Sequence, residues 1–182
     1  MRIIGGKYRG KNLFSPGSDL VRPTSDRARE ALFSILRSKL GFDFSSLKLV
    51  DVFAGSGAFG LEAMSQGFAE VALVDIDPQP LQKNVRLFSA ETARIKVIRA
   101  DACRLPAAPN AYDVLFMDAP YRKNLSEPAL KELAAKGWLK NGALCLIEVH
   151  KDELLVLPPF FEQIDERRYG IAKVIFAKFR AV

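Results

Sequence analysis

Short apolar runs alternate with helical stretches along most of this 182-residue chain, and this alternation constrains the fold most strongly. From Leu47 onward, the pattern predicts strands near residues 48–53, 70–75, 95–99, 112–117 and 143–149, and helices near 58–66, 78–89 and 126–136. Such alternation is typical of a parallel sheet with helices on both faces. The end of the chain differs, because Phe161 to Arg168 and Ile171 to Arg180 flank Tyr169-Gly170, which predicts an antiparallel hairpin. We therefore expect an α/β fold.

The first 40 residues read differently. Residues 2–8 and 11–14 predict a short hairpin with Arg9-Gly10 at its turn. Thr24-Ser25-Asp26 offers helix N-cap chemistry, and the helix that follows has one apolar face, formed by Ala28, Ala31, Leu32, Ile35 and Leu36. Four charged residues are expected largely off that face: Arg27, Arg29, Glu30 and Arg37. We predict a basic hairpin-and-helix unit over residues 1–40 and a cofactor-binding domain over residues 41–182.

A glycine-rich segment follows the first predicted strand of that domain. It reads Asp51-Val52-Phe53-Ala54-Gly55-Ser56-Gly57-Ala58-Phe59-Gly60 and matches the Gly-x-Gly-x-x-Gly pattern of dinucleotide sites. Gly55 and Gly57 allow a tight turn and close approach of the backbone to a ligand. The next strand ends in Asp75, where a carboxylate suits ribose hydroxyl groups. The cofactor is therefore expected to carry a ribose.

Two acids favour S-adenosylmethionine over a nicotinamide cofactor. Asp51 stands just before the glycine loop, where it would repel a pyrophosphate but attract an ammonium and a sulfonium. Asp101 follows the third strand and can accept a hydrogen bond from an adenine amino group. The candidate cofactor residues are Asp51, Phe53, Ala54, Gly55, Ser56, Gly57, Asp75, Ile76, Asp101 and Ala102.

The motif Asp118-Ala119-Pro120-Tyr121 follows a fourth buried strand and supplies the candidate catalytic residues. The Asp118 carboxylate and the Ala119 carbonyl can both accept hydrogen bonds from an exocyclic amine. Pro120 biases Ala119 towards extended backbone, which aims that carbonyl. Tyr121 can stack on a flat base. The pattern favours methylation of a base amino group, although an ordinary strand-to-loop turn can also read this way.

The positive charge is concentrated near the N-terminus. The chain carries a net charge of +6, and residues 1–40 hold nine Lys or Arg against three acids. The remaining residues are balanced, so the excess lies before the cofactor domain, as expected of a nucleic-acid-binding face. A solvated face remains the alternative. The candidate substrate-binding residues are Arg2, Lys7, Arg9, Arg22, Thr24, Asp26, Arg29 and Arg122.

Taken together, these segments resemble the class I methyltransferases, and within them the bacterial family that methylates N2 of a guanine in small-subunit (16S) ribosomal RNA. The specific segments are residues 1–10, Arg22 to Phe33, the glycine loop and the Asp118 motif, in which Ala119 replaces a usual proline. The resemblance implies a Rossmann-like sheet, mostly seven-stranded, with one antiparallel strand and a terminal hairpin. It also implies S-adenosylmethionine as cofactor and an assembled or nearly assembled small subunit as substrate.

Other readings stay open at this stage. They are an adenine-N6 methyltransferase acting on DNA or RNA, a nicotinamide-dependent oxidoreductase, and a non-catalytic RNA-binding protein. No apolar run approaches the length of a membrane span, and neither Cys103 nor Cys145 has metal-site spacing. We expect a cytoplasmic monomer that binds no metal.

Overall fold

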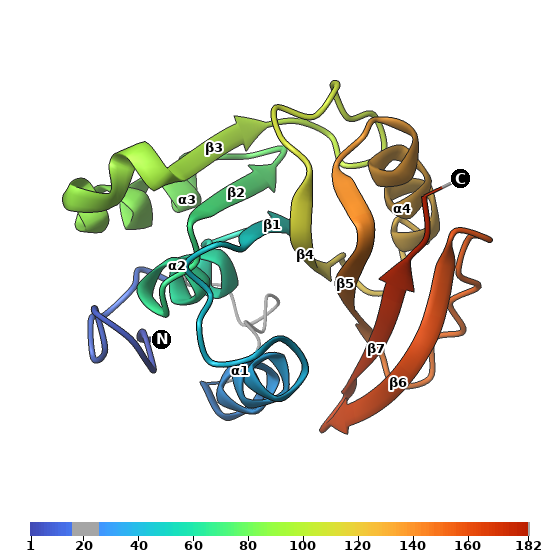
Figure 1. Ribbon diagram of the computed structural model, residues 1–182, viewed down its shortest axis with the longest axis horizontal. Helices are drawn as coiled ribbons and strands as arrows, with labels where there is room; N and C mark the ends of the chain where they lie inside the picture. Colours follow the sequence, from blue (N-terminus) through green and yellow to red (C-terminus); the bar gives the residue numbers. More distant parts are fainter. Residues whose placement is uncertain (16–25, 182) are drawn as a thin grey trace.

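The computed structural model of the protein describes residues 1–15 and 26–181. Seven strands form one sheet in the order β3-β2-β1-β4-β5-β7-β6 (Figure 1). Their bounds are β1 (Lys48–Val52), β2 (Glu70–Asp75), β3 (Ile95–Arg99), β4 (Tyr112–Asp118), β5 (Leu139–His150), β6 (Phe161–Tyr169) and β7 (Ala172–Phe179). Strands β1 to β5 pair in parallel, whereas β7 runs antiparallel to both of its neighbours. The predicted α/β sheet and terminal hairpin are confirmed, and β5 begins at Leu139 rather than at residue 143.

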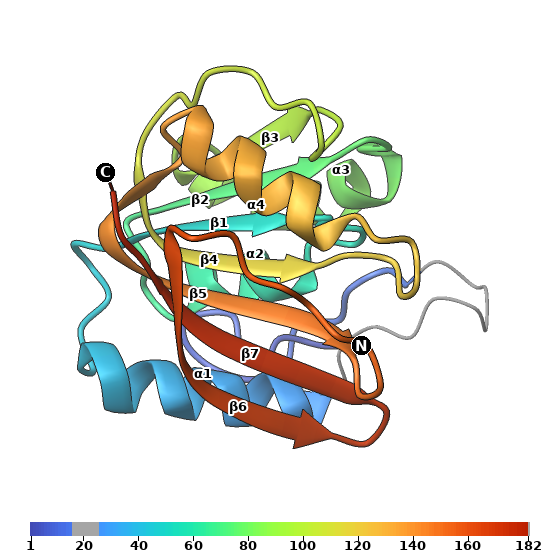
Figure 2. The same ribbon diagram turned by 90° about the vertical axis from the view of Figure 1, so that its right-hand side faces the viewer.

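Helices cover both faces of the sheet, as predicted (Figure 2). One face carries α1 (Asp26–Leu40), α2 (Ala58–Ser65), α3 (Gln79–Val85) and the 3-10 helix η1 (Arg86–Arg94), whereas α4 (Ser126–Ala135) covers the other. Alternate strand residues supply the two cores. In β4, for example, Val114 and Phe116 join the first core, and Leu115 and Met117 join the second.

The helix predicted over residues 78–89 is interrupted. α3 ends at Val85, and Phe88 leaves the helical region with φ −119° and ψ 44°. This break turns the Phe88 ring into the core, where it meets the edge of the Tyr8 ring at 5.0 Å between centroids. A contact with the distant N-terminal segment therefore overrides the local helical pattern.

The two arms of the N-terminal segment, residues 1–15, pair as predicted, but the pairing is short. The Ile3 amide donates to the Lys11 carbonyl at 2.9 Å and the Leu13 amide donates to the Met1 carbonyl at 3.0 Å, around one isolated antiparallel bridge between Arg2 and Asn12.

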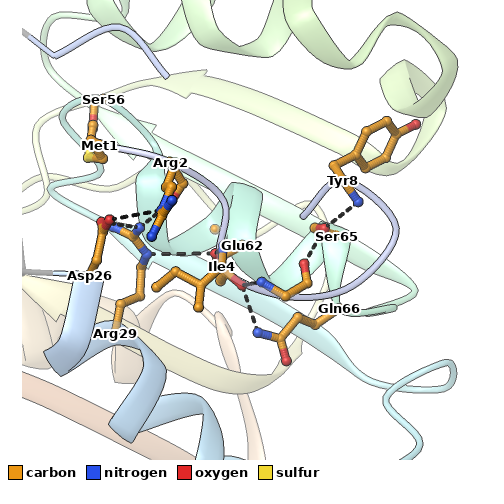
Figure 3. A network of polar contacts seen from close by, with 12 residues as sticks. Met1, Arg2, Ile4, Tyr8, Asp26, Arg29, Ser56, Glu62, Ser65 and Gln66 are labelled. Carbon is orange, nitrogen blue, oxygen red and sulfur yellow. Dashed lines mark hydrogen bonds and ion pairs between the residues drawn. The ribbon is translucent and has the colours of Figure 1, made fainter. Parts of the chain in front are cut away.

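The backbone between the arms binds α2. The Ile4 and Gly5 amides each donate to the Glu62 carboxylate at 2.8 Å, and the Tyr8 amide donates to Ser65 Oγ at 2.9 Å (Figure 3). Side chains of α2 thus hold this short hairpin against the helix.

The N-terminal segment and α1 share one hydrophobic core with the sheet. Ile3 and Leu13 from the segment, and Leu32, Phe33 and Leu36 from α1, pack in the same cluster as α2 and the strands. Residues 1–40 are therefore not separated from the rest by packing, and their distinct role in RNA binding stays a prediction. No helix within residues 1–15 and 26–181 is long and apolar enough to cross a membrane.

The buried Glu62 carboxylate should be essential for the docking of the N-terminal segment. Glu62→Gln removes the charge that faces Arg29 and places an amide group opposite the Ile4 and Gly5 amides. We expect the free energy of unfolding to fall by about 3 kcal/mol, because one partner of a buried ion pair is lost. Hydrogen exchange at the Ile4 and Gly5 amides should accelerate.

Glu127→Gln is the control, since Glu127 forms only a surface pair with Lys131. Its effect on unfolding should stay within about 0.5 kcal/mol. Equal unfolding free energies for the Glu62 variant and the wild type would contradict this role.

Candidate active site

A pocket lies where the order of the strands reverses, between β1 and β4. The carboxyl ends of parallel strands meet at this point, which is where open α/β sheets bind ligands. Residues from α1, from the ends of β1 and β4, and from the start of α2 line it: Arg29, Asp51, Phe53, Ala54, Ser56, Ala58, Phe59, Phe116 and Asp118. Five of the predicted cofactor or catalytic residues are among them.

The glycine loop after β1 turns sharply because three of its residues adopt positive φ. These are Phe53 (61°), Gly55 (56°) and Gly57 (78°). The Gly57 amide donates to the Ala54 carbonyl at 2.7 Å, which closes the turn. A Cβ atom on Gly57 would lie 2.4 Å from Leu81 Cδ1, so a side chain at this position would collide with α3.

The side chain of Asp51 is buried beneath this loop. Its Oδ2 accepts a hydrogen bond from the Gly60 amide at 2.9 Å, which fixes the start of α2 against β1. A Cβ atom on Gly60 would lie 2.2 Å from Leu73 Cδ2, so the third glycine serves close helix–strand packing. Burial raises the pKa of Asp51 to about 7, and the charge of Asp75 adds to this increase, although the Gly60 amide opposes it.

Asp75 and Asp101 stand at the ends of the next two strands. Asp75 Oδ2 accepts from the Gly55 amide at 2.8 Å, so this acid is tied to the glycine loop. The Ala100 amide donates to the Asp75 carbonyl at 3.1 Å, which brings the end of β3 beside it. Asp101 is exposed and accepts from the Cys103 amide. Ile76 is 66 % exposed, and Ala102 is buried in the second core.

Asp118 ends β4 and faces the pocket beside Asp51. In the β4–β5 register it pairs with Glu148, a buried acid. The pKa of Asp118 lies well above its ordinary value because the site is desolvated, and because Glu148 and Asp51 place negative charge nearby. The pocket thus holds two carboxyl groups, Asp51 and Asp118, whose like charges repel each other.

Tyr121 is fixed by Glu148, which the sequence reading did not select. The Tyr121 hydroxyl donates to Glu148 Oε1 at 2.8 Å. Burial and the Glu148 carboxylate raise the pKa of Tyr121, so the phenol remains neutral. The sequence does contain a signal for Glu148, because it is the one acid in the otherwise apolar run from Leu144 to Val149. An acid in a buried strand is expected to have a partner.

Non-glycine residues with positive φ gather around the site. In the described part of the chain they are Phe53 after β1, and Arg122 and Asn124 after β4. Such conformations cost free energy and are typical of functional loops. The Arg122 amide donates to Glu153 Oε2 at 3.3 Å, and its side chain is exposed beyond the Asp118 motif.

Arg29 reaches the pocket but is buried rather than exposed. It was expected off the apolar face of α1 as a contact for RNA, but its side chain is only 1 % exposed and lines the pocket. Glu62, whose carboxylate is also buried, lies 3.7 Å from Arg29 Nε, and Asp26 Oδ1 accepts from Nη2 at 2.9 Å. The helical pattern could not show this, because the partner acid belongs to α2.

The other candidate substrate residues divide into two groups. Arg2 and Asp26 lie near the pocket and form an ion pair at 3.7 Å. Lys7 and Arg9 lie near Ser65, at the end of α2 that is remote from the glycine loop. Lys7 pairs with Glu91 at 2.7 Å, and Arg9 is exposed. The structure therefore does not bring Lys7 and Arg9 to the pocket. Arg22 and Thr24 lie outside the described residues.

Solved structures with this fold place the chain in a class. The structure superposes with a TM-score of 0.85 on a putative methyltransferase, yhhF, from Escherichia coli, which is 30 % identical, with 100 % of this chain and 99 % of that chain covered. A Burkholderia thailandensis N1-methyltransferase with bound S-adenosylhomocysteine, 16 % identical over 86 % of this chain and 80 % of its own, shares the fold with a TM-score of 0.65. The fold is that of the class I S-adenosylmethionine-dependent methyltransferases.

The family is narrower than the class. A family model described as conserved hypothetical protein 95 matches residues 1–178, and the chain belongs to that family. A relative from Haemophilus influenzae, ribosomal RNA small subunit methyltransferase D, is 33 % identical over 177 residues, which cover 94 % of this chain and 90 % of the relative.

The raised pKa of Asp51 predicts how stability depends on pH. The folded state binds the Asp51 proton more tightly than the unfolded state, so this group lowers stability as the pH rises from about 4 to about 7. Compared with Asp51→Asn, which cannot titrate, the wild type should lose up to roughly 4 kcal/mol of unfolding free energy across that interval.

Urea unfolding at a series of pH values measures this difference, with Asp101→Asn, which changes an exposed acid in the loop after β3, as the control. A difference between wild type and Asp51→Asn that stays constant with pH would show that burial does not raise this pKa.

Proposed function

We propose that the protein transfers a methyl group from S-adenosylmethionine to the exocyclic N2 of a guanine in small-subunit ribosomal RNA. The observation that carries the proposal is the position of Asp118, which stands on the pocket wall beside Asp51 and opens the Ala119-Pro120-Tyr121 motif. The printed name of the Haemophilus influenzae relative supports ribosomal RNA of the small subunit as the substrate.

The residues of the pocket fit S-adenosylmethionine. The tight glycine loop leaves room for a ligand, and Asp75 and Asp101 end the neighbouring strands where a ribose and an adenine would be recognised. Ile76 offers an exposed apolar surface for a base. Asp51 supplies a carboxylate for the cationic end of the cofactor. When bound, S-adenosylmethionine supplies an electrophilic methyl group on a positively charged sulfur.

Asp118 and the Ala119 carbonyl are assigned to the amine of the target base. The N2 lone pair of guanine is delocalised into the ring, so the free amine is a poor nucleophile. Two accepted hydrogen bonds would orient the amine and favour a pyramidal nitrogen, and positioning of this kind is a large part of many rate enhancements. Tyr121, whose hydroxyl is tied to Glu148, would present its ring to the face of the base.

Asp118 is also proposed as the proton acceptor. Methyl transfer breaks the bond from sulfur to carbon, forms the bond from nitrogen to carbon, and leaves a positive nitrogen that must release one proton. A carboxylate with a raised pKa is a stronger base than an ordinary aspartate, and burial together with Glu148 and Asp51 raises the pKa of Asp118. Neither cysteine is needed, because no covalent intermediate forms.

RNA contacts are assigned to five of the candidate substrate-binding residues. Arg2 lies beside the pocket, Arg122 follows the catalytic motif, and Arg22, Thr24 and Asp26 belong to the segment that precedes or opens α1. Lys7 and Arg9 could reach only phosphates remote from the target base. We propose that a monomer acts on an assembled or nearly assembled small subunit, whose shape supplies recognition that a compact chain lacks.

Nucleoside analysis tests the proposal. The purified protein is incubated with labelled S-adenosylmethionine and, separately, unmodified small subunits, naked ribosomal RNA and duplex DNA, and the modified nucleoside is identified by mass spectrometry. N2-methylguanosine from small subunits is expected. N6-methyladenine would replace the target base, and transfer to duplex DNA alone would overturn the RNA assignment.

Asp118→Ala should abolish catalysis without preventing binding. We expect the methylation rate to fall by about 10²- to 10⁴-fold, the range of a lost acid–base group. Cofactor and small-subunit affinities should each stay within about threefold, because their other contacts remain. Asp43→Ala, in the exposed loop after α1, is the control and should retain full activity. A variant at Asp118 with unchanged turnover would remove this residue from the mechanism.

A further inference from the structure

Arg29 is a buried cation, and two of its hydrogen-bond donor atoms have no acceptor in the described part of the chain. Its side chain is 1 % exposed, although arginine is rarely buried without full pairing. Nη2 donates to the Arg2 carbonyl and to Asp26 Oδ1. Among the described residues, Nε and Nη1 have no hydrogen-bond partner, and both atoms are shielded from water. A buried donor of this kind indicates a missing acceptor.

Glu62 does not supply that acceptor. Its Oε2 accepts from the Ile4 amide, and its Oε1 accepts from the Gly5 amide and from Gln66 Nε2 at 2.7 Å (Figure 3). The 3.7 Å between Arg29 Nε and Glu62 Oε2 is an ion-pair distance rather than a hydrogen bond. Glu62 therefore holds the guanidinium in place through charge, while its oxygens serve the N-terminal segment.

The guanidinium lies in the wall of the same pocket as Asp51 and Asp118. The pocket is therefore lined by one cationic side chain, that of Arg29, and by two acidic side chains, those of Asp51 and Asp118. The amino-acid end of S-adenosylmethionine carries one carboxylate and one ammonium, and the adjoining sulfur is positive. The Arg29 guanidinium is thus opposite in charge to the carboxylate of this ligand, and Asp51 is opposite in charge to its ammonium. A charged donor paired with a carboxylate is among the stronger hydrogen bonds in proteins.

We propose that Arg29 binds the carboxylate of the amino-acid end of S-adenosylmethionine, opposite the acid that receives its ammonium. The inference rests on the cofactor of the proposed function and not on the identity of the RNA. It assigns Arg29 to the cofactor rather than to RNA.

Three ligands that differ at one end test the proposal by calorimetry. They are S-adenosylmethionine, its decarboxylated form, which keeps both cations but lacks the carboxylate, and 5′-methylthioadenosine, which lacks the amino-acid end. Wild type should bind S-adenosylmethionine about 10- to 100-fold more tightly than the decarboxylated form, as expected for one hydrogen bond to a charged group. Arg29→Gln should reduce that ratio to below about threefold.

Two comparisons separate ligand binding from a structural role. 5′-Methylthioadenosine should bind wild type and Arg29→Gln with affinities within about threefold, because neither complex contains the carboxylate. Arg37→Gln is the matched control: Arg37 lies on the same helix and donates to Gln66 of α2, but it does not line the pocket. It should keep the wild-type ratio, and Arg29→Lys should restore part of it.

Specific results would overturn the assignment. A wild type that binds both forms of the cofactor equally has no carboxylate site, and this holds even if the Arg29 variants do not fold. An Arg29→Gln protein that keeps the ratio, or loses affinity for all three ligands alike, places the carboxylate elsewhere. Methylation of a different base would contradict the proposed function while leaving these ratios unchanged.

Discussion

The Glu62 carboxylate is the interaction on which the arrangement of this protein depends. It lies inside α2, fully buried, and joins three segments that are distant in sequence. Two amides of the N-terminal segment donate to it, and Arg29 of α1 faces it across 3.7 Å. An acid in this position would be strongly unfavourable alone, so its partners must be in place for the fold to form. Residues 1–15 and α1 are therefore expected to dock on α2 together.

The same arrangement leaves charged groups of the pocket without full compensation by their neighbours. Asp51 and Asp118 are buried acids whose pKa values are raised, and Arg29 carries buried donors with no acceptor among the described residues. Each feature lowers the stability of the folded chain, and we expect binding of the proposed cofactor to offset this cost. Stability sacrificed at a site in this manner is common where function requires it. Cofactor binding should accordingly be favoured by electrostatics that the empty fold opposes.

Short-range sequence patterns predicted the features that depend on residues close together in the sequence. The strands were located because buried runs of parallel sheets are continuously apolar, and the glycine loop because only glycine tolerates its turns. The pattern predicted neither the burial of Arg29 nor the docking of the N-terminal segment on α2, since both depend on Glu62. Glu148 was not selected because its partner, Tyr121, comes from another strand end. Each of these residues is defined by a contact between segments, which periodicity does not contain.

This distinction also changes the meaning of the N-terminal charge. The excess of +6 within residues 1–40 counts side chains whose counter-charges belong to the later part of the chain. Lys7 pairs with Glu91 of η1, and Arg29 faces Glu62 of α2, so part of the apparent RNA-binding charge is internal in space. Fewer accessible cations mean fewer phosphate contacts and a shallower dependence of RNA affinity on salt. A substrate whose folded shape supplies further recognition would compensate for fewer phosphate contacts, in keeping with the proposed action on an assembled small subunit.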